Sequence, residues 1–246
     1  MRCCRTPSLA IGGLLVAGSA WSAALEPLSS GTGPNGWRFV GLPNKPDIGA
    51  TRFETGQIDG VPAVRLRTDQ SYGTWVHAWN GPAGTLQWRW RLDEPLSGGV
   101  RPANIRRKDG DDAALKVCVM FDHALERVPF GERTLLRLAR SVSGENLPAA
   151  TVCYVWDPAQ TSGASGSNAY TQRVRYLVLQ GRSAPLQRWV AESRDVAADF
   201  VRLFGDELPP NSGAGAAPPV SAVLIGADSD NTQANSNGWV TQLQWR

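Results

Sequence analysis

The chain has 246 residues, and its 25 lysines and arginines nearly balance its 22 aspartates and glutamates, which gives a formal net charge of +3. A charge this small gives no indication of a protein that binds nucleic acid electrostatically. Beyond the N-terminal segment, no stretch is apolar over the ~20 residues that a transmembrane helix needs.

The first 24 residues have the pattern of a secretory signal peptide. Arg2 and Arg5 give a positive start, residues 9–18 are apolar and uncharged, and Ser22-Ala23-Ala24 provides small residues before a cleavage site. The alternative is a membrane anchor, but the apolar run is shorter than the ~20 residues that span a bilayer. We therefore expect an exported bacterial protein, periplasmic or secreted, whose mature chain has 222 residues.

The mature chain is expected to form one domain. Residues 25–36 are predicted to be a flexible N-terminus, and residues 37–246 a single β-sandwich domain. No internal repeat or linker divides this region, and its size suits one large β domain.

Short strands follow one another along the domain. The clearest covers residues 85–92, where Leu86, Trp88, Trp90 and Leu92 share one face and polar residues take the other, as in a strand with one buried face. Residues 114–121 and 152–156 repeat this alternation, and residues 174–179 are expected to be buried on both faces. Weaker strands are expected at 63–68, 74–79, 186–192, 220–227 and 239–245. The sequence predicts an all-β fold, a two-sheet antiparallel sandwich of jelly-roll type.

One or two short helices are expected beside the strands. Residues 132–140 form one candidate, between Gly131 and Gly144. The second begins at Asp195 as N-cap, has an apolar face that includes Phe200 and Phe204, and is expected to end at Gly205. Long loops rich in glycine, proline or serine cover 95–112, 161–168 and 209–219, and such loops are mobile or functional.

Two cysteines remain after cleavage, Cys118 and Cys153, each within a predicted strand. Disulfides persist outside the cytosol, so this pair would form a bridge if the two strands are neighbours. The alternative is two buried free thiols. A zinc site is not expected, because no histidine accompanies the cysteines at zinc-ligand spacing.

Asp228, Asp230 and Asn231 follow the 220–227 strand and are candidate ligand-binding residues. Calcium binds six to eight oxygen atoms, which makes Asp228 and Asp230 candidate calcium ligands. The spacing is not that of an EF-hand loop, because Gln233 stands where that loop needs glycine. The alternative is an Asx-rich turn whose side chains bond their own backbone.

Further carboxylates are candidates for acid–base chemistry. Asp111 and Asp112 precede the 114–121 strand, where mutual repulsion would raise one pKa, although a solvated turn explains them equally well. Glu192 and Arg194 share one face of a strand and would form a bracing pair. If the protein is an enzyme, Asp111, Asp112, Glu192 and Asp230 are its candidate catalytic residues, because paired carboxylates hydrolyse glycosidic bonds.

The tryptophans divide into core and candidate platform residues. Trp88 and Trp90 lie on an alternating apolar face and are expected in the core. Trp75, Trp79 and Trp156 stand in less regular surroundings or at a strand end and are candidates for a ligand platform, since an indole ring offers stacking area and a polar N–H.

Several motifs occur together in a fixed order: Trp88-Arg89-Trp90, Gly110-Asp111-Asp112-Ala113-Ala114, Val152-Cys153-Tyr154-Val155-Trp156, Trp189 with Glu192, Arg194-Asp195-Val196 and Asp199-Phe200, Phe204-Gly205, and Asp228 with Asp230-Asn231-Thr232. In these motifs the chain resembles the bacterial domain of unknown function 3047 family (DUF3047), from about Trp37 to the C-terminus. The resemblance implies an exported β protein and brings no established activity.

The leading hypothesis is non-catalytic binding of a carbohydrate-like or other polar ligand, with a glycan as the expected partner class and calcium as the candidate ion; no other cofactor is predicted. The alternatives are a glycan hydrolase or lyase and a structural or assembly factor of the cell envelope. Nucleophilic catalysis has little support, because His77 and His123 are the only histidines and no Gly-x-Ser-x-Gly motif occurs. Glycine-rich phosphate-binding motifs are also absent from the sequence.

Overall fold

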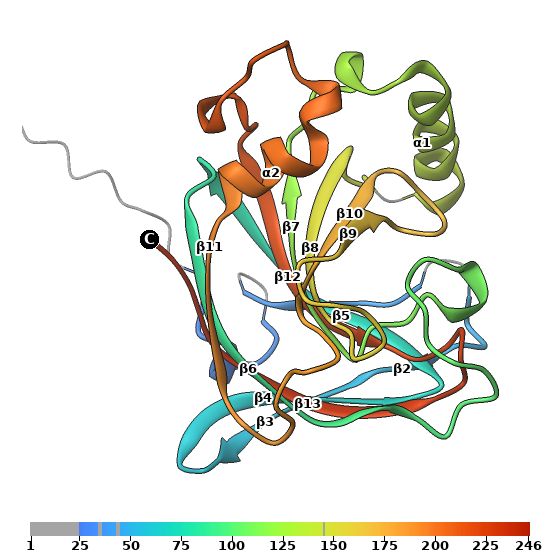
Figure 1. The fold of residues 1–246 in the computed structure, drawn as a ribbon, viewed down its shortest axis with the longest axis vertical. Helices are drawn as coiled ribbons and strands as arrows, with labels where there is room; N and C mark the ends of the chain where they lie inside the picture. Colours follow the sequence, from blue (N-terminus) through green and yellow to red (C-terminus); the bar gives the residue numbers. More distant parts are fainter. Residues whose placement is uncertain (1–24, 34–35, 43–44, 145) are drawn as a thin grey trace, which may run out of the picture.

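The computed structural model describes residues 25–33, 36–42, 45–144 and 146–246 (Figure 1). The predicted signal peptide, residues 1–24, lies outside the described residues. Among the described helices, none is long and apolar enough to cross a membrane.

The larger of two sheets has eight strands, in the order β1-β5-β12-β7-β8-β10-β9, with β2 paired to β5 (Figure 1). Its strands are β1 (Arg38–Val40), β2 (Gly49–Ala50), β5 (Ser71–Gly81), β7 (Leu115–Phe121), β8 (Ala150–Trp156), β9 (Ser165–Ser167), β10 (Val174–Gln180) and β12 (Val220–Asp228). Most neighbours are antiparallel, but β8–β10 and β2–β5 are parallel pairs, which the sequence pattern did not indicate.

The smaller sheet has five strands, in the order β11-β6-β13-β4-β3. They are β3 (Arg52–Ile58), β4 (Val61–Asp69), β6 (Thr85–Ser97), β11 (Val190–Asp195) and β13 (Asn235–Trp245). The strand expected to begin at Leu186 starts only at Val190. The predicted two-sheet sandwich with short helices is confirmed, while the jelly-roll order of its connections stays a prediction.

The main core lies between the two sheets, as the alternating pattern predicts. Trp88 and Trp90 of β6 are almost fully buried and meet the rings of Tyr154 and Trp156 of β8 at centroid distances of 5.2 and 5.5 Å. Each aromatic pair adds about 0.5–1.5 kcal/mol beyond the area it buries, so this ladder of rings joins one sheet to the other.

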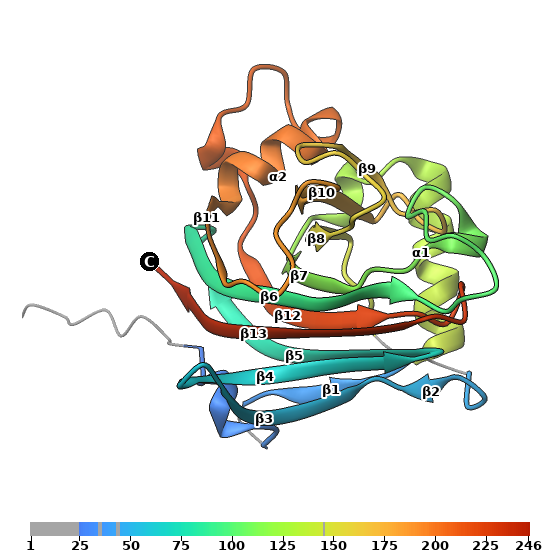
Figure 2. The same cartoon turned by 60° about the horizontal axis from the view of Figure 1, so that its bottom comes forward.

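Two α-helices accompany the sheets, α1 (Phe130–Ser143) and α2 (Val196–Phe204) (Figure 2). The Asp195 side chain caps α2 by accepting a hydrogen bond from the Ala198 backbone at 2.9 Å, as predicted. α2 closes one end of the core, where the tilted rings of Phe200 and of Phe121, at the end of β7, have their centroids 4.6 Å apart. α2 ends at Phe204 with Gly205 as its C-cap, as expected, but the Gly205 backbone is right-handed, and the chain continues into a 3₁₀ turn at Gly205–Glu207.

Residues 25–36 do not match the flexible N-terminus that was expected there. In its described part, Leu25 and Leu28 are buried in the main core, and Leu28–Ser30 forms a 3₁₀ turn. The Glu26 carbonyl accepts a hydrogen bond from the Trp37 indole at 2.8 Å. Two leucines that bury their side chains hold this segment against the sandwich.

A second, smaller apolar cluster covers the outer face of the larger sheet. It contains Cys118 of β7 and Cys153 of β8, together with side chains from β5, β10 and β12. Ile105 and Ala113 belong to it, so the loop between β6 and β7 folds over this face. This loop, predicted at 95–112 to be mobile or functional, thereby forms one wall of the site described next.

Candidate functional site

Three segments that lie far apart in the sequence meet at the end of the sandwich opposite α2. They are the end of the loop before β7, the turn after β12, and the loop between β8 and β10. β7 and β12 are antiparallel neighbours with Lys116 opposite Gly226, so the start of one strand lies beside the end of the other. This pairing brings Asp111 and Asp112 next to Asp228 and Asp230, which the sequence alone did not place together.

Asp112 organises the turn after β12. Its Oδ2 accepts hydrogen bonds from the Thr232 backbone N–H at 2.7 Å and from the Thr232 hydroxyl at 2.5 Å. Its Oδ1 accepts a hydrogen bond from the Asn231 backbone N–H at 3.2 Å. The buried carboxylate is therefore well satisfied, and it fixes the turn that carries Asp230 and Asn231.

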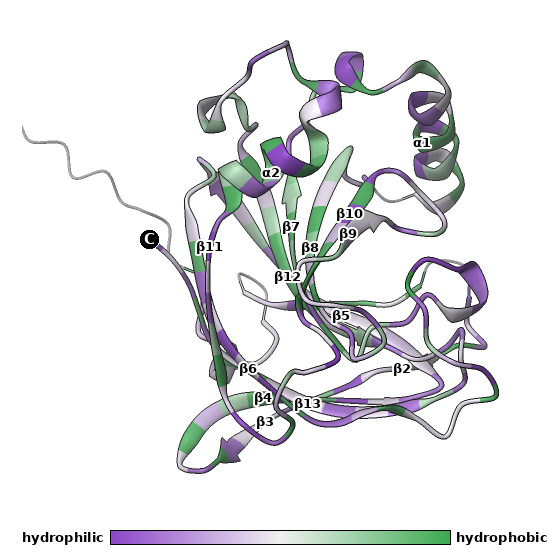
Figure 3. Ribbon diagram, in the orientation of Figure 1, coloured by the Kyte–Doolittle hydropathy of each residue, from purple (hydrophilic) through white to green (hydrophobic). Residues whose placement is uncertain are grey.

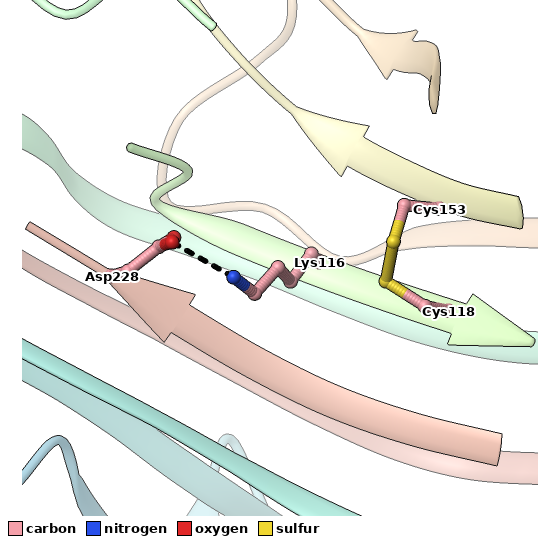
Figure 4. Close-up of a disulfide and its surroundings, with 4 residues drawn as sticks. All are labelled: Lys116, Cys118, Cys153 and Asp228. Carbon is pink, nitrogen blue, oxygen red and sulfur yellow. Dashed lines mark hydrogen bonds and ion pairs between the residues drawn. A yellow bond between two sulfur atoms is a disulfide. The ribbon is translucent and has the colours of Figure 1, made fainter. Parts of the chain in front are cut away.

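Asp228 forms a buried ion pair with Lys116 of β7 (Figure 4). The Lys116 Nζ lies 2.8 Å from Oδ2 of Asp228, and the Ala113 backbone N–H donates to Oδ1 at 2.9 Å. Burial alone would lower the pKa of Lys116, but the Asp228 carboxylate raises it above its ordinary value, so the ammonium stays charged. Lys116 is thus the resident counterion of the carboxylate cluster, although the sequence reading did not single it out.

Asp230 has an incompletely satisfied carboxylate. Its Oδ1 is buried, and no donor among the described residues reaches it. One carboxylate oxygen from each of Asp112, Asp228 and Asp230 lies within 4.8 Å of the other two. Burial first, and then the charges of Asp228 and Asp112, raise the pKa of Asp230 to about 6.

Asp111 has a different hydrogen-bond partner from its neighbour Asp112. Its Oδ2 accepts a hydrogen bond from the Asn168 side chain, which comes from the loop between β8 and β10. Burial, followed by the charge of Asp228, raises the pKa of Asp111 to about 6. We call Asp111, Asp112, Asp228 and Asp230 the acidic cluster. Even with Lys116 as counterion, this cluster has an excess of negative charge.

A small cavity of about 70 Å³ opens beside the acidic cluster. Asp111, Asp112, Lys116 and Asp228 line its polar side, while Val155 and Tyr176 are among the apolar residues of its floor. Cys153 also lines it, and the structure joins Cys153 to Cys118 by a disulfide on the adjacent strands (Figure 4). The covalent link between β7 and β8 therefore lies directly behind the cavity.

An exposed tyrosine stands at the rim of this site. Tyr170 is 57 % exposed, and its hydroxyl lies 2.8 Å from the Lys108 carbonyl and 2.9 Å from Oδ1 of Asn231. Neither Tyr170 nor Asn168 was identified from the sequence. The one feature of the sequence that pointed to them was their position in or just after the serine- and glycine-rich loop at 161–168.

The expected tryptophan platform is wrong. Trp75 and Trp79 are buried on β5, and Trp156 is fully buried at the end of β8. Trp75 stacks on Phe53 and Trp79 on Trp245, at centroid distances of 5.0 and 5.4 Å. These rings fill the space between the sheets and offer no face to a ligand.

Glu192 lies on the smaller sheet and does not join the acidic cluster. It accepts hydrogen bonds from the Trp90 indole at 3.0 Å and from the Gln180 side chain at 2.7 Å. The predicted Glu192–Arg194 brace is also wrong, because Arg194 pairs with Asp199 of α2 at 2.5 Å. Both side chains are therefore accounted for by contacts that hold β11 in place.

A larger hollow of about 310 Å³ lies further along the outer face of the larger sheet. It is lined by side chains of both charges, including Arg38, Arg140 and Asp122, over an apolar floor. This mixed lining favours no single class of ligand, and none of the residues predicted from the sequence lies in it. The acidic cluster is therefore the better candidate site.

Comparison with known proteins gives a family but no activity. A family model described as "Protein of unknown function (DUF3047)" matches residues 35–244. The chain is similar to the xyloglucanase domain of NopAA, a type three effector from Sinorhizobium fredii solved with cellobiose, at 11% identity over 87% of this chain and 96% of that one, with a TM-score of 0.44. It is also similar to the K2 cleaved adhesin domain of Lys-gingipain, at 9% identity over 91% of this chain and 99% of that one, with a TM-score of 0.36. These values are too low to transfer a ligand or a reaction, and no curated protein matches the sequence.

Proposed function

Because the chain belongs to the DUF3047 family, whose function is unknown, we propose from its own geometry that it is an exported, non-catalytic binding protein. In this proposal the acidic cluster holds a calcium ion, and a carbohydrate-like ligand binds at the rim of the same site. The observation that carries it is the buried Oδ1 of Asp230, which has no donor among the described residues and lies beside two further carboxylates.

The charges of the cluster favour a divalent cation. Of its carboxylates, Asp228 has Lys116 as counterion and Asp112 is satisfied by the turn it holds. Burial first, and then the charge of Asp228, keeps the pKa values of Asp230 and Asp111 raised. A hard cation that prefers oxygen would lower both values, and Asp112, Asp228, Asp230 and Asn231 offer the oxygens from which calcium takes ligands.

The rim favours a ligand rich in hydroxyl groups. The exposed ring of Tyr170 gives an apolar surface next to polar groups, which suits the alternating C–H and O–H faces of a sugar. Protein calcium sites often complete their coordination with water oxygens, and sugar hydroxyls can replace such waters. In this proposal the ligand binds beside Tyr170 and Asn231.

A second candidate function, the cleavage of a glycan by a hydrolase or lyase reaction, rests on the raised pKa values of Asp111 and Asp230. A carboxyl group that titrates near 6 can serve as a general acid at neutral pH. Glu192, the fourth candidate catalytic residue, is remote from this cluster and bonded to Trp90. Turnover of a glycan that is lost in Asp111→Asn would favour this second function.

Calorimetric titration of calcium into the mature protein, residues 25–246, tests the proposal. Wild type is expected to bind, and calcium at a hundredfold excess over its Kd should stabilise the fold by about 2.7 kcal/mol. Asp230→Asn should abolish binding, whereas Asp122→Asn, which changes an exposed carboxylate elsewhere, should not. Binding that survives Asp230→Asn, or no binding by wild type, would remove the acidic cluster as a calcium site.

A glycan array with and without calcium then tests the ligand class, with Tyr170→Ala as the site variant. A calcium-dependent signal that falls in Tyr170→Ala supports the proposed ligand. Calcium binding without any glycan signal would limit the role of the ion to stability. Export is tested separately, by N-terminal sequencing of the protein recovered from the periplasm or culture medium.

A further inference from the structure

The cavity beside the acidic cluster is lined by two kinds of side chain. Its volume of about 70 Å³ leaves room for roughly two water molecules or one small organic group. Its polar side is formed by Asp111, Asp112, Lys116, Asn168 and Asp228. The other described residues that line it are mainly apolar and form its floor: Ile105, Ala113, Cys153, Val155, Val174 and Tyr176. A group that fills this cavity must therefore be apolar at one end and polar at the other.

The apolar floor is held in place by the larger sheet. Cys118, Cys153 and Tyr176 lie in register on β7, β8 and β10, and the disulfide joins the first two (Figure 4). Figure 3 shows apolar segments on these strands. Ile105 and Ala113 belong to the same apolar cluster, so the loop before β7 closes over the floor. Because a floor braced in this way does not collapse, a small apolar group that enters the cavity gains dispersion contacts on several sides.

The polar side presents both a hydrogen-bond acceptor and a hydrogen-bond donor. The Asp111 carboxylate is oriented by the Asn168 side chain, which donates to its Oδ2. The Lys116 ammonium is held by Asp228 at 2.8 Å and lies 4.9 Å from the centroid of the Tyr72 ring. A carboxylate accepts hydrogen bonds and an ammonium donates them, so a group with one N–H and one carbonyl would match both.

The charges of the lining exclude other small groups. Among the described residues that line the cavity, three aspartates outnumber Lys116, so a carboxylate or phosphate group would be repelled. An ammonium group would lie next to the Lys116 ammonium, and a hydroxyl group would leave the apolar floor uncovered. An acetamido group has a methyl for the floor, an N–H for Asp111 and a carbonyl for Lys116.

We infer that this cavity receives the acetamido group of an N-acetylated amino sugar. The inference rests on the proposed function, because it names the class of the carbohydrate-like ligand at the same site. With the methyl group on the apolar floor, the sugar ring lies toward the exposed Tyr170 at the rim. The acetamido group is assigned to Asp111 and Lys116, neither of which is a proposed calcium ligand.

Saturation-transfer NMR of the mature protein with monosaccharides, in the presence of calcium, tests this inference. N-Acetylglucosamine is compared with glucosamine and glucose, and N-acetylgalactosamine with galactosamine and galactose, so that the sugars of each series differ only in the substituent beside the anomeric carbon. The N-acetylated sugar of at least one series should bind roughly tenfold more tightly than the other two sugars of that series. Its acetyl methyl protons should receive the largest saturation, because they lie against the floor of the cavity.

Two variants test the two sides of the cavity. Val174→Phe fills part of the floor and should weaken binding of the N-acetylated sugar about tenfold or more, while calcium affinity stays unchanged. Asp111→Asn keeps the shape of the side chain but removes the charged acceptor, and should weaken the same binding about tenfold. The matched control is Val142→Phe, which adds the same bulk to a valine that is 67 % exposed on α1, and it should bind as wild type does.

The possible outcomes separate this inference from the proposed function. Equal binding of the three sugars in both series, or tightest binding of an amine, would overturn the inference and leave a carbohydrate ligand in place. Wild-type affinity in Asp111→Asn would overturn it as well, and this variant decides alone if the melting temperature shows that Val174→Phe does not fold. If none of these sugars binds, the inference fails, and the glycan array decides separately whether the proposed ligand class fails with it.

Discussion

The Asp230 carboxylate is expected to destabilise the calcium-free protein, so Asp230→Asn should stabilise it. The side chain has a buried Oδ1 that no donor in the described part of the chain reaches, near the carboxylates of Asp112 and Asp228. Its pKa rises from 3.8 to about 6 in the folded state, chiefly through burial. A rise of this size corresponds to about 3 kcal/mol. Because the group is partly exposed, solvent screening leaves about 1–1.5 kcal/mol as the expected effect.

The stabilisation expected from Asp230→Asn depends on pH in a defined direction. Below about pH 3.8 the carboxyl group is protonated in both folded and unfolded chains, so it costs nothing. As the pH rises toward about 6, the unfolded chain releases its proton first, and the folded state loses relative stability. The gain from Asp230→Asn should therefore be full above pH 6 and fall to about a third by pH 4.5.

The effect is measured by urea unfolding at pH 7.5 and 4.5 in the presence of a chelator, with intrinsic tryptophan fluorescence as the signal. At pH 7.5 the variant should gain about 1–1.5 kcal/mol, or about 2–6 °C in melting temperature for a domain of this size. Asp122→Asn is the matched control and should change little. A variant less stable than wild type at pH 7.5, or a gain of equal size at both pH values, would refute the electrostatic reasoning.

Three further changes test other parts of the structure. Lys116→Met should destabilise the protein by about 3–5 kcal/mol at pH 7, measured by urea unfolding, because it leaves Asp228 buried without its counterion; a loss below 1 kcal/mol would contradict the buried pair. Replacing Cys118 and Cys153 together by serine should cost about 4 kcal/mol, since the bridge closes a loop with a sequence separation of 35, and a reducing agent should have the same effect on wild type but none on the variant. Glu207→Gln should cost about 3 kcal/mol near neutral pH, because this carboxylate bonds two buried partners, His123 and Arg173. Burial alone would raise the pKa of Glu207, but mainly the hydrogen bond to His123 lowers it to about 2. In acid-unfolding curves, the difference in unfolding free energy between this variant and wild type should therefore narrow as the pH falls from about 4.5 toward 2.

The alternation of apolar and polar residues was enough to predict the strands and the faces that they bury. Leu86, Trp88, Trp90 and Leu92 lie in the core as this pattern requires, because side chains on a strand alternate strictly between its two faces. The cap of α2 at Asp195 was predictable for a similar reason, since a cap depends on residues within one turn. The errors at Trp75, Trp79 and Trp156 came from treating irregular local pattern as exposure, when the neighbouring strands and segments bury these rings.

The sequence by itself therefore determined the all-β class, the buried faces and the segments rich in carboxylates, because each of these depends on residues close together in the chain. Only the tertiary structure decided which carboxylates meet. Asp112 reaches Thr232, Lys116 reaches Asp228, and Glu192 lies on the other sheet, through contacts that depend on the order and register of strands. Strand register is set by packing across the whole sandwich, so it is not written in any local stretch of sequence.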